Sequence, residues 1–296
     1  MANFYNFCTK NDENRGEAKM NNKIGVQVVY HKNVHLLDKF RTAMAMDIHS
    51  CQLCIWDESM FTDEYAKIVN DAVAETGFEI TTVWAGWGGP CEWNFTYGPA
   101  TIGLVPPAYR DSRLETLKKA SAFAAKIGVS KVVTHVGFIP ENPDDPNFTG
   151  TVGALRNLCK LMKTRNQYFL FETGQETPIT MLRTIQAIGL DNIGINFDTA
   201  NLILYGKANT LDALDVFGQY VMETHIKDGL YPTDGMSLGK EMPAGQGKAN
   251  LPAVIKKLGE LGYTGTFTIE REIYGEQQQK DIAMARDLLK RWMQEV

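Results

Sequence analysis

The sequence predicts a single-domain α/β protein, a (β/α)8 or TIM barrel, and three observations lead to that prediction. From residue 23 onward, eight short runs of β-branched and apolar residues alternate with longer stretches of helical periodicity. Several of the helical stretches end in glycine just before the next strand, which is a common way to end a helix. The turn after the first strand, VYHKNVH, contains no glycine. A doubly wound open sheet, the structural alternative, would usually carry a glycine-rich phosphate turn there.

The elements follow one another in a regular order. The expected strands are 23–30, 51–56, 79–85, 131–137, 168–174, 193–199, 221–228 and 265–272. Helices expected between them include 62–77, 112–128 and 251–262, and a last helix over 279–296 closes the chain. The helix-ending glycines are Gly77, Gly128, Gly189 and Gly262. Long loops over 86–113 and 229–249 follow the third and seventh strands, and because barrel active sites are built from such loops, both are expected to be functional.

Composition limits the classes of protein to consider. The 296 residues are 44% hydrophobic and 22% charged, which is ordinary for a globular domain. A net charge of −5 gives no support for nucleic-acid binding, and no run of about 18 apolar residues indicates a membrane span. Residues 1–22 lack the apolar segment of a signal peptide, so we expect a polar leader ahead of a catalytic domain over 23–296, and a cytoplasmic location.

The cysteines fit that location. Five is an odd count, and a chain of this length does not need a disulfide framework. Cys51 and Cys54 form a C-x-x-C, but the run around them is expected to be a strand, where residues three apart face opposite sides. With no second C-x-x-C, we interpret both as structural and not as zinc ligands.

Four ligand-type residues occupy matching positions on the last four strands. Glu172 ends the fifth expected strand, Asp198 the sixth, His225 lies near the end of the seventh, and Glu270 ends the eighth. In a barrel these strand ends converge on one mouth. Three carboxylates so close together cannot all remain ionised without a cation, so the pattern predicts one bound divalent metal. Because the set has no thiolate, Mn²⁺ is favoured, with Mg²⁺ or Co²⁺ as alternatives, over a structural zinc.

Four segments carry a resemblance to a known family. FETGQE, NFDTAN, HIKDG and GYTGTFTIERE resemble the xylose-isomerase-like barrels described as sugar phosphate isomerases/epimerases, over residues 23–296. The resemblance implies that Glu172, Asp198, His225 and Glu270 bind a divalent metal and that the two glutamates also serve as acid and base. The metal acidifies a C–H beside a ketose carbonyl, one glutamate removes the proton to give a cis-enediolate, and the other returns it.

At some positions the chain departs from the ketohexose 3-epimerases of that family. Asn201 stands where they carry a His, Pro178 where they carry a Glu, with Glu176 two places earlier, and Tyr231 where an Arg is expected. HIKDG is closer to the sugar-phosphate branch.

Several further residues are candidates for substrate contacts. Lys227 is a candidate catalytic residue that would stabilise the enediolate, the alternative being a rim ion pair with Asp228. His135 could bind substrate or a second metal, or be a buried structural histidine. The remaining substrate-binding candidates are Trp84, Trp87, Asn201 and Glu176. A glycine-rich stretch with Lys240 and Lys248 could hold a phosphate, or serve as a lid hinge.

The sequence leaves more than one function open. The leading hypothesis is a metal-dependent isomerase or epimerase of a ketose or sugar phosphate, working without nucleic acid or membrane, in a possible homo-oligomer. An inosose-type dehydratase would begin with the same proton abstraction and expel a β-hydroxyl. A non-catalytic sugar-binding barrel is the alternative outside enzymes. An abasic-site endonuclease is opposed by five histidines and the negative charge.

Overall fold

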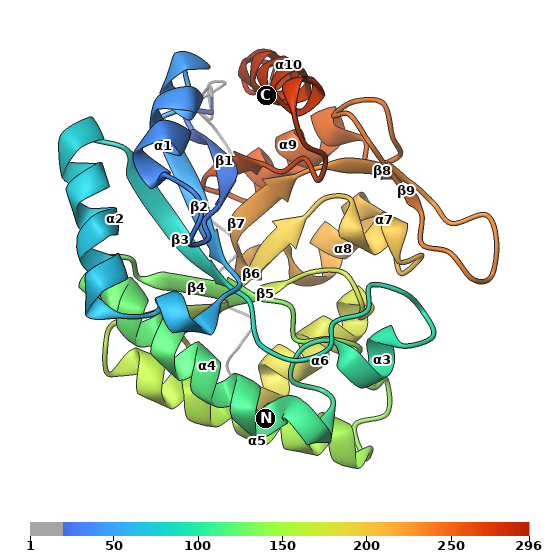
Figure 1. Ribbon diagram of the computed structural model, residues 1–296. Helices are drawn as coiled ribbons and strands as arrows, with labels where there is room; N and C mark the ends of the chain where they lie inside the picture. Colours follow the sequence, from blue (N-terminus) through green and yellow to red (C-terminus); the bar gives the residue numbers. More distant parts are fainter. Residues whose placement is uncertain (1–19, 296) are drawn as a thin grey trace, which may run out of the picture.

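The computed structural model of the protein describes residues 20–295 and shows a closed barrel of eight parallel strands (Figure 1). Around the barrel the strand order is β1-β10-β7-β6-β5-β4-β3-β2. The barrel strands are β1 (Ile24–Val29), β2 (Ser50–Ile55), β3 (Glu79–Ala85), β4 (Lys131–Thr134), β5 (Tyr168–Glu172), β6 (Ile193–Asp198), β7 (Val221–Ile226) and β10 (Phe267–Ile269). The predicted fold class and all eight predicted strands are confirmed. Most of the expected leader, residues 1–19, lies outside the described residues.

Helices surround the barrel on its outer side (Figure 1). The main ones are α1 (Leu36–Ala45), α2 (Asp63–Thr76), α4 (Pro107–Lys126), α5 (Pro146–Lys163), α6 (Pro178–Ile188), α8 (Thr210–Phe217), α9 (Leu251–Glu260) and α10 (Glu276–Trp292). Short helical turns add η1 (Glu58–Met60), α3 (Gly98–Thr101), α7 (Asn201–Leu204) and η2 (Gly218–Tyr220). Within residues 20–295, no helix combines the length and the apolar character needed to cross a bilayer.

The glycines expected to end helices do so in the left-handed conformation. Gly77, Gly128, Gly189 and Gly262 have φ of 68°, 71°, 67° and 77°. A Cβ disfavours this conformation, which is why the sequence signal was reliable. Helix α4 starts at Pro107, earlier than the residue 112 that periodicity suggested, because proline fits the first turn of a helix.

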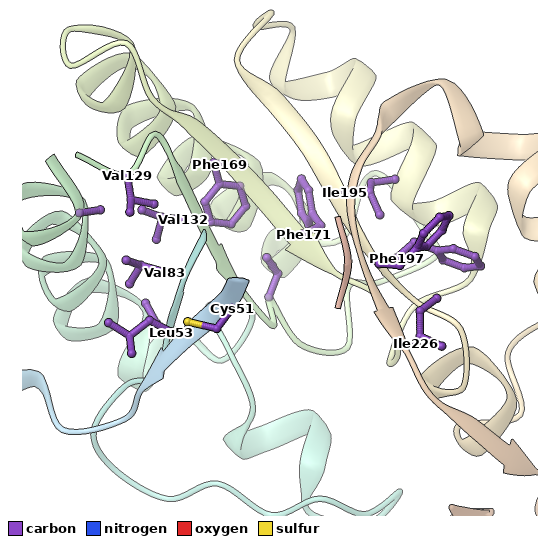
Figure 2. Packing of buried hydrophobic residues seen from close by; sticks show 14 of the residues in the cluster. Cys51, Leu53, Val83, Val129, Val132, Phe169, Phe171, Ile195, Phe197 and Ile226 are labelled. Carbon is purple, nitrogen blue, oxygen red and sulfur yellow. The ribbon is translucent and has the colours of Figure 1, made fainter. Parts of the chain in front are cut away.

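Side chains alternate between the two faces of each strand. On the outer face, apolar residues such as Phe169, Phe171, Ile195 and Phe197 pack into the main core between barrel and helices (Figure 2). Inside the barrel, Leu170 belongs to a smaller apolar cluster that also contains Cys54 and Trp84. Cys51 lies in the outer core and Cys54 in the inner cluster, so the prediction that they face opposite sides is confirmed. The same alternation directs Glu172 and Asp198 inward.

The two long loops contain structure of their own. The loop after β3 includes α3 and is fastened to the segment just after β4 by the Leu104 backbone N–H, which donates to Val136 O at 2.7 Å. The loop after β7 forms an antiparallel pair of short strands, β8 (Asp228–Leu230) and β9 (Lys240–Met242). The sequence analysis predicted both stretches only as long loops.

Candidate active site

The four predicted ligand residues meet inside the barrel at the carboxyl ends of β5, β6, β7 and β10. These strands are neighbours in the barrel, and Asp198 is directly paired in register with His225. The Nδ1 atom of His225 lies 3.1 Å from Glu172 Oε1, 3.3 Å from Glu270 Oε2 and 3.9 Å from Asp198 Oδ2. All four residues are buried.

Three atoms of this cluster lack a hydrogen bond within residues 20–295. They are Glu172 Oε1, Asp198 Oδ2 and His225 Nδ1, and ligand atoms of these three residues all lie within 4.8 Å of one another. Buried polar atoms normally have a partner, and leaving one unpaired is costly. Two carboxylate oxygens and an imidazole nitrogen facing one point are a donor set that suits a divalent cation. The residues therefore fit the predicted metal.

A chain of side-chain amides fixes the orientation of Glu172 and His225. The Asn196 side-chain amide donates to Glu172 Oε2, so Asn196 Oδ1 faces away and accepts from Gln52 Nε2 at 2.7 Å. Gln52 therefore presents Oε1 to His225 Nε2, at 2.9 Å. Because a carbonyl oxygen only accepts, Nε2 carries the proton of the neutral ring and Nδ1 keeps its lone pair for a cation. Gln52 thus holds the ring nitrogen of His225 that faces away from the cluster.

The other two carboxylates are held in a similar way. Asp198 Oδ1 accepts from the backbone N–H groups of Ala200 and Asn201, at 2.7 and 2.8 Å, which leaves Oδ2 for the site. Glu270 Oε1 accepts from Gln27 Nε2 at 2.6 Å, and its Oε2 lies 3.0 Å from Lys227 Nζ. Each carboxylate thus has one oxygen fixed by the protein scaffold.

Lys227 is buried beside the cluster. Its Nζ lies 2.9 Å from Glu272, 3.0 Å from Glu270 and 3.4 Å from Asp198. The alternative pairing with Asp228 is not what the structure shows, because the Asp228 carboxylate is taken up by backbone N–H groups of its own loop. Although burial opposes the charged form, these carboxylates raise the pKa of Lys227 well above its usual value.

The pKa shifts reflect a dense cluster of buried charge. Burial raises the pKa of Asp198 well above its ordinary value. Burial opposes ionisation of Glu270 as well, but Lys227 and His225 hold the pKa of Glu270 well below its usual range. For His225, burial lowers the pKa, yet Glu172 and Glu270 outweigh it and raise the pKa well above normal. The buried carboxylates thus favour positively charged forms of the groups next to them.

A cavity of about 620 Å³ adjoins the cluster and extends over β1 to α1 and α10. Its lining includes Glu172, Glu270 and Lys227, together with the substrate-contact candidates Trp84, His135 and Asn201. The other two candidates lie elsewhere. Trp87 is buried, and the Cζ atom of the Arg113 guanidinium lies 5.2 Å from the centre of the Trp87 ring. Glu176 is buried outside the lining, and burial raises its pKa to about 8.

Sequence reasoning missed several residues around the site. Gln27 and Gln52 support the ligand residues from β1 and β2, and Trp56 and Tyr205 line the cavity. A signal for the two glutamines was available: each is a polar residue at an inward position of an otherwise apolar strand. Trp56, Trp84, Trp93 and His135 form an aromatic wall, with ring centroids 4.9 Å apart for Trp56–Trp84 and 5.1 Å for Trp93–His135.

Solved structures share this architecture. A xylose isomerase domain protein from Planctomyces limnophilus is 32% identical, with a TM-score of 0.86 over 93% of this chain and 98% of that one. A xylose isomerase-like TIM barrel protein from Mycobacterium smegmatis, crystallised with magnesium, is 18% identical, with a TM-score of 0.67 over 88% of each chain. The 3-keto-D-glucoside 4-epimerase of E. coli is 17% identical, with a TM-score of 0.67 over 91% of this chain and 99% of that one.

Sequence comparison points the same way. An uncharacterised protein of Methanocaldococcus jannaschii is 24% identical over 199 residues, covering 62% of this chain and 64% of that protein. The match thus spans less than two thirds of the length of this curated relative. The profile of the family described as "Xylose isomerase-like TIM barrel" matches residues 40–294. The chain therefore belongs to the xylose isomerase-like TIM barrel family.

Proposed function

We propose that the protein is a divalent-metal-dependent isomerase or epimerase acting on a ketose. The observation that carries the proposal is the convergence of three unpaired buried atoms, on Glu172, Asp198 and His225, beside a cavity that Glu172 itself lines. A divalent ion bound there, Mn²⁺ or Mg²⁺, would polarise a substrate carbonyl and acidify the neighbouring C–H. The structures of family members that are named epimerases support the same class of reaction.

Two carboxylates would move the proton. Glu172 and Glu270 come from β5 and β10, which are separated in the barrel by β6 and β7, so they approach the cavity from different sides. Asn196 holds one oxygen of Glu172, and Gln27 holds one oxygen of Glu270. One carboxylate removes a proton from the substrate carbon, and the other delivers a proton to the opposite face or to the neighbouring carbon. Lys227 supplies positive charge beside the oxygen that becomes negative.

Solvent proton exchange tests this proposal. Incubation with a panel of ketoses and ketose phosphates in D₂O with Mn²⁺ should incorporate deuterium into at least one of them. Glu270→Gln should keep its metal, because Glu172, Asp198 and His225 remain to hold it, and lose exchange, because a glutamine amide cannot take a proton. Glu79→Gln, at the exposed start of β3 where Glu79 pairs with Lys23, is the matched control and should exchange at the wild-type rate. Exchange at that rate in Glu270→Gln would assign the base to another group.

The dehydratase alternative differs from the isomerase in the product that it forms. Both reactions begin with removal of a proton next to a carbonyl, but elimination of a β-hydroxyl gives an unsaturated or diketone product. Incubation with keto-inositol and analysis of the products by mass spectrometry distinguishes them: loss of one water would replace the isomerase assignment, whereas an unchanged mass with deuterium uptake supports it.

A further inference from the structure

We propose that the substrate of this site is an unphosphorylated sugar. The inference rests on the proposed function and limits the proposed substrates to sugars without a phosphate group. Three features of the structure lead to it. A carboxylate of the chain itself fills the loop where an anion would bind, and the two cationic side chains near the cluster are already paired with acidic residues. The third feature is a cavity wall that offers neutral hydrogen-bonding groups.

The first feature is the loop after β7. Barrels usually bind phosphate at the loops after their last two strands, where backbone N–H groups converge. Here four N–H groups converge, but on the side chain of Asp228. Its Oδ1 accepts from Gly229 and Ala249 at 2.9 and 3.0 Å, and its Oδ2 accepts from Gly245 and Gly247 at 3.0 and 2.9 Å.

Asp228 fills this N–H nest completely. The side chain is buried, and a Cβ added to Gly247 would lie 2.1 Å from Asp228 Oδ1. A phosphate needs the same N–H donors, so it cannot bind while the carboxylate is in place. The glycine-rich stretch that could have held a substrate phosphate instead holds an anion of the chain itself. Lys240 and Lys248, the lysines of that stretch, are exposed and lie outside the lining of the cavity.

The second feature is the charge of the cavity. Among the described residues its lining includes three cations, Lys39, Lys227 and Arg271. Lys227 is surrounded by three carboxylates, and Arg271 pairs with Glu241 at 2.7 Å and Asp281 at 2.8 Å. Lys39 lies exposed on α1, outside the barrel. The lining also includes four glutamates, namely Glu172, Glu241, Glu270 and Glu272. A divalent ion would neutralise the cluster without leaving positive charge for a dianionic phosphate.

The third feature is the wall formed by Tyr205, Asn201 and His135, which surround Gly174. A Cβ at Gly174 would lie 3.3 Å from Asn201 and 3.6 Å from both His135 and Tyr205. All three line the cavity, and in the described part of the chain Tyr205 Oη and His135 Nδ1 make no hydrogen bond. Burial raises the pKa of Tyr205 to about 12 and lowers that of His135, so both side chains are neutral at pH 7. Neutral donors and acceptors suit sugar hydroxyls, and the aromatic wall suits the apolar face of a sugar.

Ligand binding tests the inference directly. Quenching of tryptophan fluorescence is a suitable signal because Trp56, Trp84 and Trp93 line the cavity. With Mg²⁺ present, D-fructose should be compared with D-fructose 6-phosphate, and D-ribulose with D-ribulose 5-phosphate. We expect the free ketose of a pair to bind more tightly by roughly tenfold, since the phosphate would lose its hydration without gaining partners. Tighter binding of the phosphate ester, or no binding by any of the four, overturns the proposal.

Tyr205→Phe tests the neutral wall in the same assay. Loss of one hydrogen bond should weaken binding of the free ketose several-fold. Tyr168→Phe, at the opposite end of β5, is the matched control and should bind as the wild type does. If both variants bind the free ketose equally well, Tyr205 is not part of the sugar-binding wall.

Asp228→Ala tests the filled nest. Removing the carboxylate leaves four N–H groups unpaired, two of them buried, so the variant should be less stable than the wild type. Inorganic phosphate should restore part of its thermal stability and have little effect on the wild type. Asp234→Ala is the control, because Asp234 also accepts two backbone N–H bonds in this loop but is exposed. If phosphate stabilises Asp228→Ala no more than these controls, the loop is not an anion site. If the variant does not fold, the ketose comparison on the wild-type protein decides.

The two proposals fail in different ways. Preference for the free ketose without deuterium exchange would leave a sugar-binding barrel and overturn the proposed reaction. Exchange on a ketose phosphate, together with tighter binding of that phosphate, would keep the reaction and overturn the inference about the substrate.

Discussion

Lys227 is unusual among the lysines of this chain because it is buried next to residues that are themselves charged. Asp198, Glu270 and Glu272 surround its ammonium group within 3.4 Å. The position follows from the strand geometry, since Lys227 comes two residues after His225 and its side chain emerges on the same face. It therefore reaches the space above the ligand residues, where a substrate oxygen would gain negative charge.

Replacing that charge should affect turnover more than binding. For Lys227→Met we expect kcat to fall roughly ten- to a thousand-fold, the usual effect of losing one electrostatic stabiliser, with a smaller change in KM. Metal content, measured by elemental analysis, should be unchanged. Lys240→Met, at the exposed first residue of β9, is the matched control. A rise in KM alone would limit Lys227 to substrate binding.

Glu176 gives a prediction about stability and pH. Burial raises its pKa to about 8 in the folded protein, from an ordinary value of 4.5. Between these pH values the folded state keeps a proton that the unfolded chain has released, so this residue's contribution to stability is lost as the pH rises through about 8. Glu176→Gln cannot ionise. Its free energy of unfolding relative to the wild type should rise by on the order of 3 kcal/mol from pH 5 to pH 8.

Urea unfolding at pH 5, 6, 7 and 8 measures this difference. The exposed Glu79→Gln provides the comparison, and its difference from the wild type should stay nearly constant with pH. Parallel pH profiles for wild type and Glu176→Gln would show that Glu176 is ionised in the folded protein.

At the scale of elements, the periodicity of apolar residues predicted the strands and helices that depend on it. A strand with two buried faces gives a nearly continuous apolar run, and helix ends give a glycine, so all eight strands and the helix-ending glycines could be located. Pairing of β8 with β9 could not be predicted, because these strands have three residues each and owe their pairing to the surrounding loop. The site shows the same division. Strand-end residues converge by topology, whereas Trp87 and Glu176 were placed on loops, whose packing the sequence does not encode locally.

The loop after β3 depends on two glycines that no periodicity could identify as critical. Gly103 has φ 72°, and a Cβ there would lie 2.0 Å from Val136 O. Gly137 has φ 103°, and its Cβ would lie 2.2 Å from Ile102 O. The two backbones therefore touch. Because Val136 follows His135 directly, this contact also fixes the segment after β4 that carries His135.

Gly103→Ala should strain this contact. We expect a loss of roughly 1 to 3 kcal/mol in the free energy of unfolding, from the left-handed backbone and the steric overlap together. Gly153→Ala, in α5 with no atom within 4 Å of the added Cβ, should instead gain about 0.5 to 1 kcal/mol. Chemical denaturation of both variants gives the comparison. Equal stability of Gly103→Ala and wild type would mean that the loop moves away from β4 without cost.

At the scale of the whole molecule, the cluster of predicted ligands connects four neighbouring strands of the barrel. The four predicted ligands come from β5, β6, β7 and β10, which are consecutive around the barrel wall. The amide chain extends the connection across the interior, since Gln52 lies on β2 and contacts both Asn196 of β6 and His225 of β7. In the unfolded chain these residues are far apart in sequence. A cation held by them would bind the folded state selectively.

Metal binding should therefore stabilise the entire fold. At a metal concentration about 100 times the dissociation constant, the expected gain is about 2.7 kcal/mol, which corresponds to roughly 5 to 10 °C in the thermal midpoint. Chelation with EDTA should lower the midpoint of the wild-type protein by this amount, and Mn²⁺ should restore it. In Glu172→Gln the midpoint should respond to neither treatment, because the amide offers a weaker donor in place of the unpaired carboxylate oxygen. Glu79→Gln should behave as the wild type does. A midpoint that does not change with EDTA in the wild-type protein, with elemental analysis showing that metal has been removed, would mean that the four strands hold their arrangement without help from the cation.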